Sequence, residues 1–252
     1  MKDVRVLPEK ARIAQAAVEI ILQHADIAVQ CRNRFNLMLS GGSTPLAVYS
    51  LLASRSVSTQ ISWDRWHLFW GDERCVPPDH PDSNFGTVRE ILLESVPIPL
   101  QNIHRILGEL PPTESATRYQ SELQEHFAHG EYIGGFPSFD LILLGMGTDG
   151  HTASLFPDSP VLGEKLNWVS PVKHTSPPLP IVDRVTVTLP LINAAEQVLF
   201  LIAGRGKSER LKQVLSLQGV QNEALPASMV VPVKGKLTWL VDRAAAGDWE
   251  TV

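Results

Sequence analysis

Cysteine is scarce in this sequence: Cys31 and Cys75 are the two present, and neither belongs to a C-x-x-C pair. This scarcity excludes a disulfide framework and favours two unpaired thiols in a reducing compartment. The eight histidines also lack H-E-x-x-H or any comparable metal-binding spacing. We therefore expect no metal ion and no cofactor.

Long apolar runs are missing as well. No stretch approaches the roughly 18 to 20 apolar residues that cross a bilayer, and the first residues carry no apolar signal core. Positive charge is in deficit, with 22 Lys and Arg against 27 Asp and Glu. That balance argues against a nucleic-acid partner or a membrane surface and leaves room only for a local basic pocket. We expect a cytoplasmic protein that binds a small molecule, as a monomer or a small homo-oligomer.

What the sequence does contain is an alternation of strand-like and helix-like segments. Apolar residues recur at helical spacing over residues 9–30 and 113–129. Short apolar runs predict strands over residues 36–39, 65–70, 139–144, 184–189, 198–203 and 237–241. This order is typical of an α/β fold with a doubly wound, mostly parallel sheet and helices on both faces. The Pro-rich stretches are too short for linkers, so residues 1–252 are predicted to form one domain.

The most informative segment is residues 139–151, where a continuous apolar run ends at glycines and is followed by Asp149 and His151. Such a run suits a strand that is covered on both faces, and open parallel sheets bind ligands beyond the carboxyl ends of their strands. Histidine side chains commonly act as general bases near neutral pH, so His151 is a candidate for that role. The alternative is a Gly-rich connection whose histidine is merely solvated.

Two further loops follow predicted strands. The segment SGGSTP, residues 40–45, can point backbone N–H groups at an anion or simply cap a helix. The segment GDER, residues 71–74, offers Arg74 to a carboxylate or phosphate, although a solvated salt-bridge cluster is the alternative. Residues 82–84, DSN, could fold over the same rim, and ordinary turn chemistry explains them equally well.

A third loop, GRGK at residues 204–207, resembles the end of a nucleotide P-loop. It fails that test because the first glycine of the motif would fall at Leu201, inside a strand. A glycine turn with Lys207 at a helix start remains, and this can bind a phosphate. Arg184, which opens an alternating strand, is another candidate cation, with a solvated edge charge as the alternative.

Together these motifs resemble the 6-phosphogluconolactonase family, within the wider group that also contains glucosamine-6-phosphate deaminases. The resemblance rests on residues 40–45, 71–74, 82–84, 145–157, 184–186 and 204–207, in that order. It implies a Rossmann-like α/β fold. It also implies hydrolysis of a sugar-phosphate lactone, 6-phospho-D-glucono-1,5-lactone, to 6-phospho-D-gluconate in the oxidative pentose phosphate pathway.

The resemblance also assigns roles. His151 would be the general base that activates water, with Asp149 beside it shaping the site and Arg74 placed near the substrate. Asp72 matches the proton-transfer acid of the deaminases, and in a lactonase the hypothesis is that it organises Arg74. The group that resembles the sugar-phosphate site is Gly42, Ser43, Thr44, Arg184 and Lys207.

Two other functions stay open. A deaminase would continue after Asp-Gly-His toward Asn-Glu-Pro, and here the corresponding residues are Leu155, Phe156 and Pro157, so the ring-opening acid is missing. A non-catalytic sugar-phosphate sensor would not need both Asp149 and His151, and no helix-turn-helix extension or basic arm is apparent. The lactonase interpretation is therefore favoured.

Overall fold

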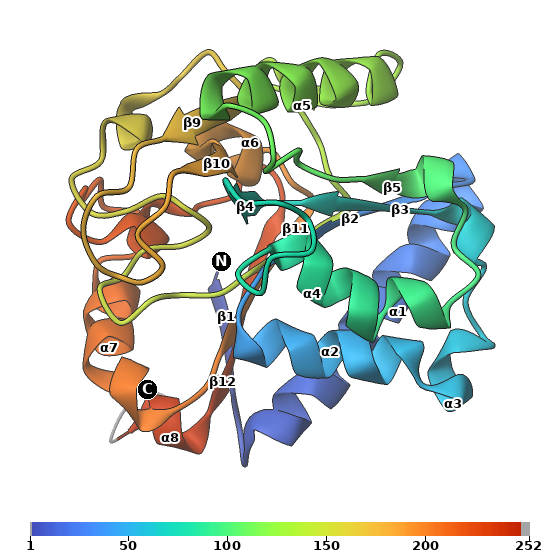
Figure 1. The fold of residues 1–252 in the computed structure, drawn as a ribbon. Helices are drawn as coiled ribbons and strands as arrows, with labels where there is room; N and C mark the ends of the chain where they lie inside the picture. Colours follow the sequence, from blue (N-terminus) through green and yellow to red (C-terminus); the bar gives the residue numbers. More distant parts are fainter. Residues whose placement is uncertain (1, 248–252) are drawn as a thin grey trace.

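A parallel sheet of seven strands forms the centre of the molecule (Figure 1), in the order β1-β12-β11-β8-β2-β3-β5. This computed structural model describes residues 2–247. Every neighbouring pair in the sheet is parallel. The strands are β1 (Lys2–Leu7), β2 (Phe35–Leu39), β3 (Trp66–Trp70), β5 (Ile103–His104), β8 (Leu141–Leu144), β11 (Gln197–Ile202) and β12 (Lys236–Asp242).

Helices cover both faces of this sheet, which confirms the predicted doubly wound α/β fold. In Figure 1, α1 and α2 lie below the sheet and α5 lies above it. The helices are α1 (Lys10–Arg32), α2 (Ser43–Ala53), α3 (Arg55–Ser58), α4 (Asn84–Ile91), α5 (Pro112–His126), α6 (Leu189–Asn193), α7 (Ser208–Ser216) and α8 (Arg243–Ala246). Every residue of β2, β8 and β11 is buried, because both faces of these strands are covered.

One predicted strand belongs elsewhere. The prediction counted residues 184–189 among the strands of the main sheet, but β10 (Arg184–Val187) forms a separate antiparallel sheet with β4 (Asp72–Arg74) and β9 (Val169–Val172). The remainder of the predicted segment begins α6. A short hairpin, β6 (Tyr132–Ile133) with β7 (Phe136–Pro137), completes the strands.

The prediction also missed the first strand. β1 has a single neighbour, β12, so it is an edge strand with alternating charged and apolar residues rather than a continuous apolar run. Within residues 2–247, no helix has the length and apolar character needed to cross a membrane. The fold brings the loops that follow β2, β3, β8 and β11 to one edge of the sheet, because parallel strands share the same carboxyl end.

Candidate active site

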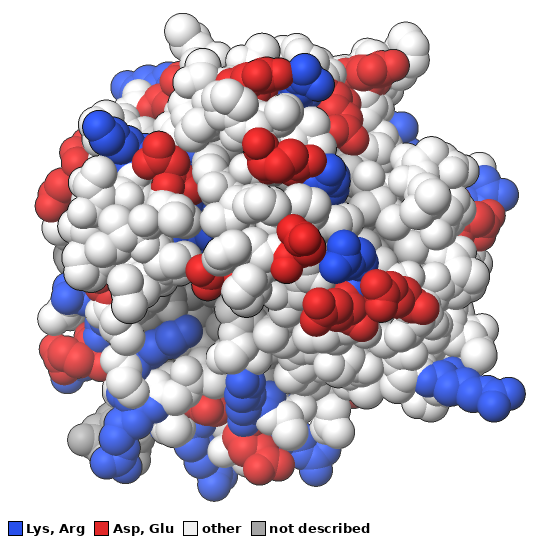
Figure 2. Space-filling model, viewed as in Figure 1, with Lys and Arg blue, Asp and Glu red and all other residues white. Residues whose placement is uncertain are grey.

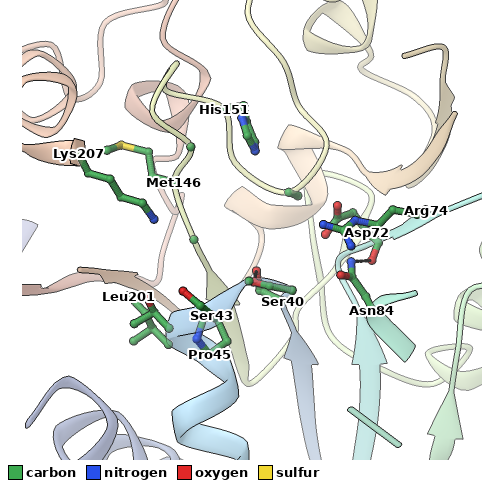
Figure 3. A pocket seen from close by; sticks show the side chains of 16 residues that line it. Ser40, Ser43, Pro45, Asp72, Arg74, Asn84, Met146, His151, Leu201 and Lys207 are labelled. Atoms are coloured by element: carbon green, nitrogen blue, oxygen red, sulfur yellow. Dashed lines mark hydrogen bonds between the residues drawn. The ribbon is translucent and has the colours of Figure 1, made fainter. Parts of the chain in front are cut away.

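These loops surround a cavity of about 150 Å³ (Figure 3). The residues that line it come from all of the loops singled out in the sequence. They are Ser40, Gly41, Gly42, Ser43, Thr44, Pro45, Asp72, Arg74, Asn84, Gly145, Met146, Gly147, His151, Ala153, Leu201 and Lys207. On the face shown in Figure 2, Lys and Arg side chains gather around a hollow beside α7. Seven of the nine predicted site residues therefore lie around one cavity, and the other two, Asp149 and Arg184, are not among the residues that line it.

His151 reaches this cavity from the loop after β8 and is held from behind by Asp149. Its Nδ1 lies 2.6 Å from Asp149 Oδ1, and the same oxygen accepts the His151 backbone N–H at 3.1 Å. Burial alone would raise the pKa of Asp149, but the hydrogen bonds and charge of His151 outweigh it and hold that pKa below its ordinary value. An ionised Asp149 accepts the Nδ1–H, which leaves the lone pair of His151 on Nε2.

The close approach of this pair depends on a glycine. A Cβ on Gly147 would overlap both the His151 ring and the Asp149 carboxylate. Gly150 has a φ of +92°, in the region that glycine adopts without strain. The Phe156 ring packs on His151 with centroids 4.9 Å apart, and Phe156 itself stacks on His174 at 4.3 Å. Phe156, itself stacked on His174, thus restricts the orientation of the imidazole.

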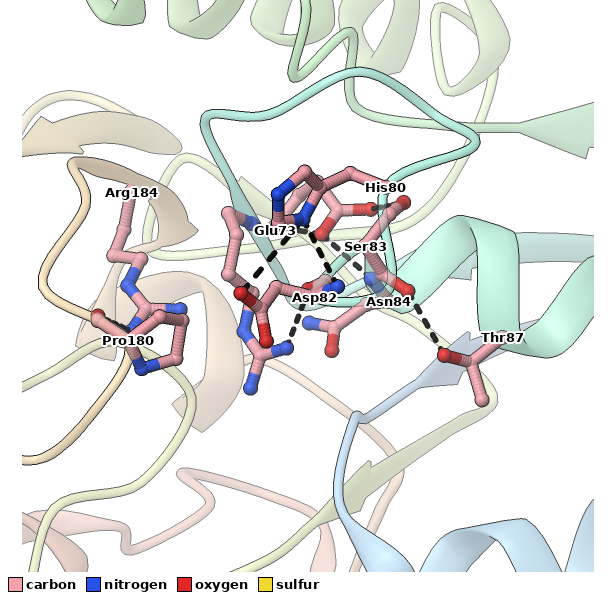
Figure 4. Close-up of polar contacts among 9 residues, drawn as sticks. Glu73, His80, Asp82, Ser83, Asn84, Thr87, Pro180 and Arg184 are labelled. Atoms are coloured by element: carbon pink, nitrogen blue, oxygen red, sulfur yellow. Dashed lines mark hydrogen bonds and ion pairs between the residues drawn. The ribbon is translucent and has the colours of Figure 1, made fainter.

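The loop after β3 is anchored by Glu73, whose role the sequence did not reveal. Glu73 is 1% exposed, and its carboxylate accepts the backbone N–H groups of Arg74, Asn84 and Phe85 at 2.7–2.8 Å. The Ser83 hydroxyl donates to it at 3.1 Å (Figure 4). Burial raises the pKa of Glu73, and the backbone hydrogen bonds oppose that effect. Glu73 therefore joins the GDER segment to the start of α4.

This anchor places the polar groups on one wall of the cavity. The Arg74 guanidinium donates to the Asp82 carbonyl at 2.6 Å, and Asn84 Nδ2 donates to the Asp72 carbonyl at 2.9 Å. Asp72 is 8% exposed, and its Oδ2 accepts the Ser154 hydroxyl at 2.7 Å. Residues 82–84 thus fold over the same rim as Arg74, as the sequence suggested.

The opposite wall holds Lys207 and the SGGSTP loop (Figure 3). Gly42 has a φ of +97° and directly precedes α2, so Ser43 and Thr44 occupy its first turn. Lys207 follows β11, where Asp242 accepts the Gly204 backbone N–H at 3.0 Å and fixes the start of the loop. Burial lowers the pKa of Lys207, Lys10 adds to the effect, and Asp242 opposes it. A bound anion would compensate the half-buried ammonium group.

Arg184 is not the solvated edge charge considered as an alternative. It is 3% exposed, and its guanidinium donates to the Pro180 carbonyl at 2.7 Å (Figure 4). Its Nε has no hydrogen-bond partner among residues 2–247. Burial and the neighbouring charge of Arg74 lower the pKa of Arg184, while Asp72 and Asp82 raise it.

Known proteins are similar to this chain along nearly its whole length. The family described as glucosamine-6-phosphate isomerases/6-phosphogluconolactonase matches residues 8–239. The 6-phosphogluconolactonase of Nostoc sp. is 39% identical over 98% of both chains, and that of Homo sapiens is 40% identical over 96% of this chain and 92% of its own. The crystal structure of the Thermotoga maritima 6-phosphogluconolactonase superimposes with a TM-score of 0.80 at 32% identity, covering 96% of this chain and 100% of that one. The chain belongs to the glucosamine-6-phosphate isomerase/6-phosphogluconolactonase family.

Proposed function

We propose that this protein is a 6-phosphogluconolactonase, which hydrolyses 6-phospho-D-glucono-1,5-lactone to 6-phospho-D-gluconate in the oxidative pentose phosphate pathway. The observation that carries the proposal is the 2.6 Å contact between His151 and Asp149 at a cavity that also holds Arg74 and Lys207. A base and two cations are what a water attack on an anionic lactone requires. Relatives that cover nearly the whole chain carry the same name.

In the proposed mechanism, His151 Nε2 takes a proton from a water molecule as the water oxygen attacks the lactone carbonyl. The resulting tetrahedral oxyanion collapses, the bond between the carbonyl carbon and the ring oxygen breaks, and the ring oxygen leaves as the C5 hydroxyl after receiving the proton. The ionised Asp149 stabilises the imidazolium formed in between. No covalent intermediate with the protein is needed, because the ester has its leaving group within the same molecule.

The substrate phosphate is assigned to the wall formed by Lys207 and the first turn of α2, where an ammonium group faces the amino end of a helix. This leaves Arg74, on the opposite wall, for the carbonyl end of the substrate. In this proposal Asp72 organises the Arg74 wall, which its hydrogen bonds with Ser154 and Asn84 support. A phosphate contact of Arg184 stays a prediction, because that side chain lies outside the cavity lining.

Amino-sugar deamination is the second candidate, because Asp72 lines the cavity as a proton-transfer acid would. Phe156 weighs against it. The position where the deaminase pattern carries a ring-opening acid holds an aromatic ring packed on His151.

Substrate choice tests the proposed function. The wild-type protein is given freshly generated 6-phosphogluconolactone and, separately, glucosamine 6-phosphate, and the release of acid and of ammonia are followed. We expect acid release well above spontaneous hydrolysis and no ammonia. Ammonia release without accelerated lactone hydrolysis would establish the deaminase instead, and activity on neither substrate would favour a sensor.

A further inference from the structure

Three histidines that are far apart in the sequence meet between the sheet and α5. His67 lies on β3, His104 on β5, and His126 is the last residue of α5. Each offers one ring nitrogen, and these three nitrogens lie within 4.8 Å of one another. The spacing of these histidines in the sequence does not predict the cluster, because the pairing of β3 with β5 and the packing of α5 bring them together.

Hydrogen bonds on the outer side of the cluster orient the rings. His104 Nδ1 lies 2.8 Å from Glu122 Oε1, and His126 Nε2 lies 2.8 Å from Asn36 Oδ1. Since a carboxylate can only accept, His104 carries its proton on Nδ1 and its lone pair on Nε2. That Nε2 is directed at His67 Nδ1, 3.1 Å away. The arrangement is the carboxylate–histidine pair that commonly stands behind a metal-ligating imidazole.

The surroundings disfavour the charged form of two of these imidazoles. Burial, together with His104 and Arg34, lowers the pKa of His67 to about 4. Burial, His104, His67 and Arg34 lower the pKa of His126 to about 3. Imidazole binds a metal through an unprotonated nitrogen, so the Nδ1 proton that His67 donates to His104 has to move to His67 Nε2 when a metal binds. Glu122 supplies the negative charge beside the cluster, and Arg34 the positive charge.

From this geometry we propose that His67, His104 and His126 form a binding site for a divalent transition metal ion of the class that imidazole prefers, such as Zn²⁺ or Co²⁺. Two nitrogens bound tetrahedrally at about 2.0–2.1 Å from a zinc ion lie roughly 3.3 Å apart. The His67–His104 contact of 3.1 Å is already close to that spacing. His126 has to approach by about 1.5 Å, which side-chain rotation at the end of a helix can supply. A water molecule would complete the four ligands.

An ion at this site would hold the edge of the sheet rather than act on the lactone. His67 and His126 are partly exposed, which leaves a route from solvent, while His104 is buried. His67 precedes Asp72 by five residues, a distance of up to about 16 Å along an extended chain. The ion would join β3, β5 and α5, so the proposal does not depend on the proposed function.

Titration with Zn²⁺ tests the site. The full chain, freed of metal with a chelator, is titrated calorimetrically in the His151→Asn background, so that the pair at the cavity cannot contribute. We expect one Zn²⁺ per chain and, at a hundredfold excess over Kd, a rise in Tm of about 5–10 °C. His126→Ala should abolish this binding, and Glu122→Gln should weaken it about 10–100-fold. His129→Ala, an exposed histidine three residues beyond His126, is the matched control and should bind as before.

A second measurement needs no variant of the cluster. Co²⁺ bound to the otherwise unchanged protein should give the intense visible bands of tetrahedral nitrogen coordination, and Zn²⁺ should displace it. Failure to bind Zn²⁺ at millimolar concentration, an octahedral Co²⁺ spectrum, or Zn²⁺ binding that survives His126→Ala would each overturn the proposal. If the three histidines serve only as packing, the protein will fail to bind Zn²⁺ at millimolar concentration.

Discussion

Replacing His151 by asparagine tests the proposed mechanism most directly. The imidazole donates to Asp149 over 2.6 Å and presents its other nitrogen to the cavity. Asparagine can keep a donor toward Asp149, but no atom of its side chain can accept a proton from water at neutral pH. General-base catalysis typically contributes about 10²–10⁴-fold, so we expect kcat to fall by that factor, equivalent to about 2.7–5.4 kcal/mol in the barrier.

Substrate binding should survive the same change. Arg74, Lys207 and the first turn of α2 remain in place, so KM for the lactone and Kd for 6-phosphogluconate should change by less than about threefold, because the lost interaction acts in the transition state. The initial rate of acid release from fresh lactone is measured against spontaneous hydrolysis in the same buffer, and product binding is measured by calorimetry.

Controls separate a lost base from a lost fold. His129 is exposed and lies beyond the end of α5, so His129→Asn makes the same chemical change away from the cavity and should leave the rate unchanged. A thermal melt of His151→Asn should overlay that of the wild type within a few degrees. Lactone hydrolysis by a folded His151→Asn protein at more than a third of the wild-type rate would refute the assignment of His151 as the base.

Three further predictions follow from the surroundings of the site. Lys207→Ala should weaken binding of 6-phosphogluconate about 10–100-fold in calorimetry without changing the weak binding of gluconate, and equal losses for both ligands would contradict the phosphate assignment. Glu73→Gln should lower the free energy of unfolding in urea by at least about 2 kcal/mol, whereas Glu94→Gln, at a side chain 62% exposed, should have little effect. The pKa of Asp149 in the folded protein lies below the ordinary 3.8, so the ionised carboxylate stabilises the fold above that pH. The free energy of unfolding lost in Asp149→Asn should therefore shrink as the pH falls through the folded pKa. A pH-independent difference between the two proteins in urea unfolding would contradict this.

The parts of the fold that the sequence predicted are those where both faces of a strand are buried. The runs that became β2, β3, β8, β11 and β12 are mostly apolar because helices cover them on both sides. β1 was not predicted because an edge strand lacks a continuous apolar run. β10 was assigned to the wrong sheet because its sequence indicates a strand but not its partner strands, which are the antiparallel β4 and β9.

The site was predictable where a strand runs directly into a polar loop, and less so where contacts join distant segments. His151 and Arg74 follow buried strands within a few residues, so the position of the strand end sufficed. Glu73 looked like one member of a solvated charge cluster, because its partners lie about ten residues further on. Its signal was the pairing of an acid after a strand with a Ser-Asn helix start. His67, His104 and His126 gave no signal at all, since three-dimensional packing alone brings them together.

The pairing of β4 with β10 places two arginines side by side, and this arrangement favours the binding of negative charge in the cavity. Arg74 and Arg184 are cross-strand partners, and like charges in that position are unfavourable. Asp72 and Asp82 oppose the repulsion, yet the pKa of Arg184 stays below its ordinary value because burial and Arg74 outweigh them. An anion bound beside Arg74 would offset both the repulsion between the two arginines and the unfavourable burial of Arg184. In the proposed mechanism, the negative charge that develops on the lactone oxygen and the product carboxylate are anions of this kind, so the wall would favour the transition state and the product over the uncharged ester group of the substrate.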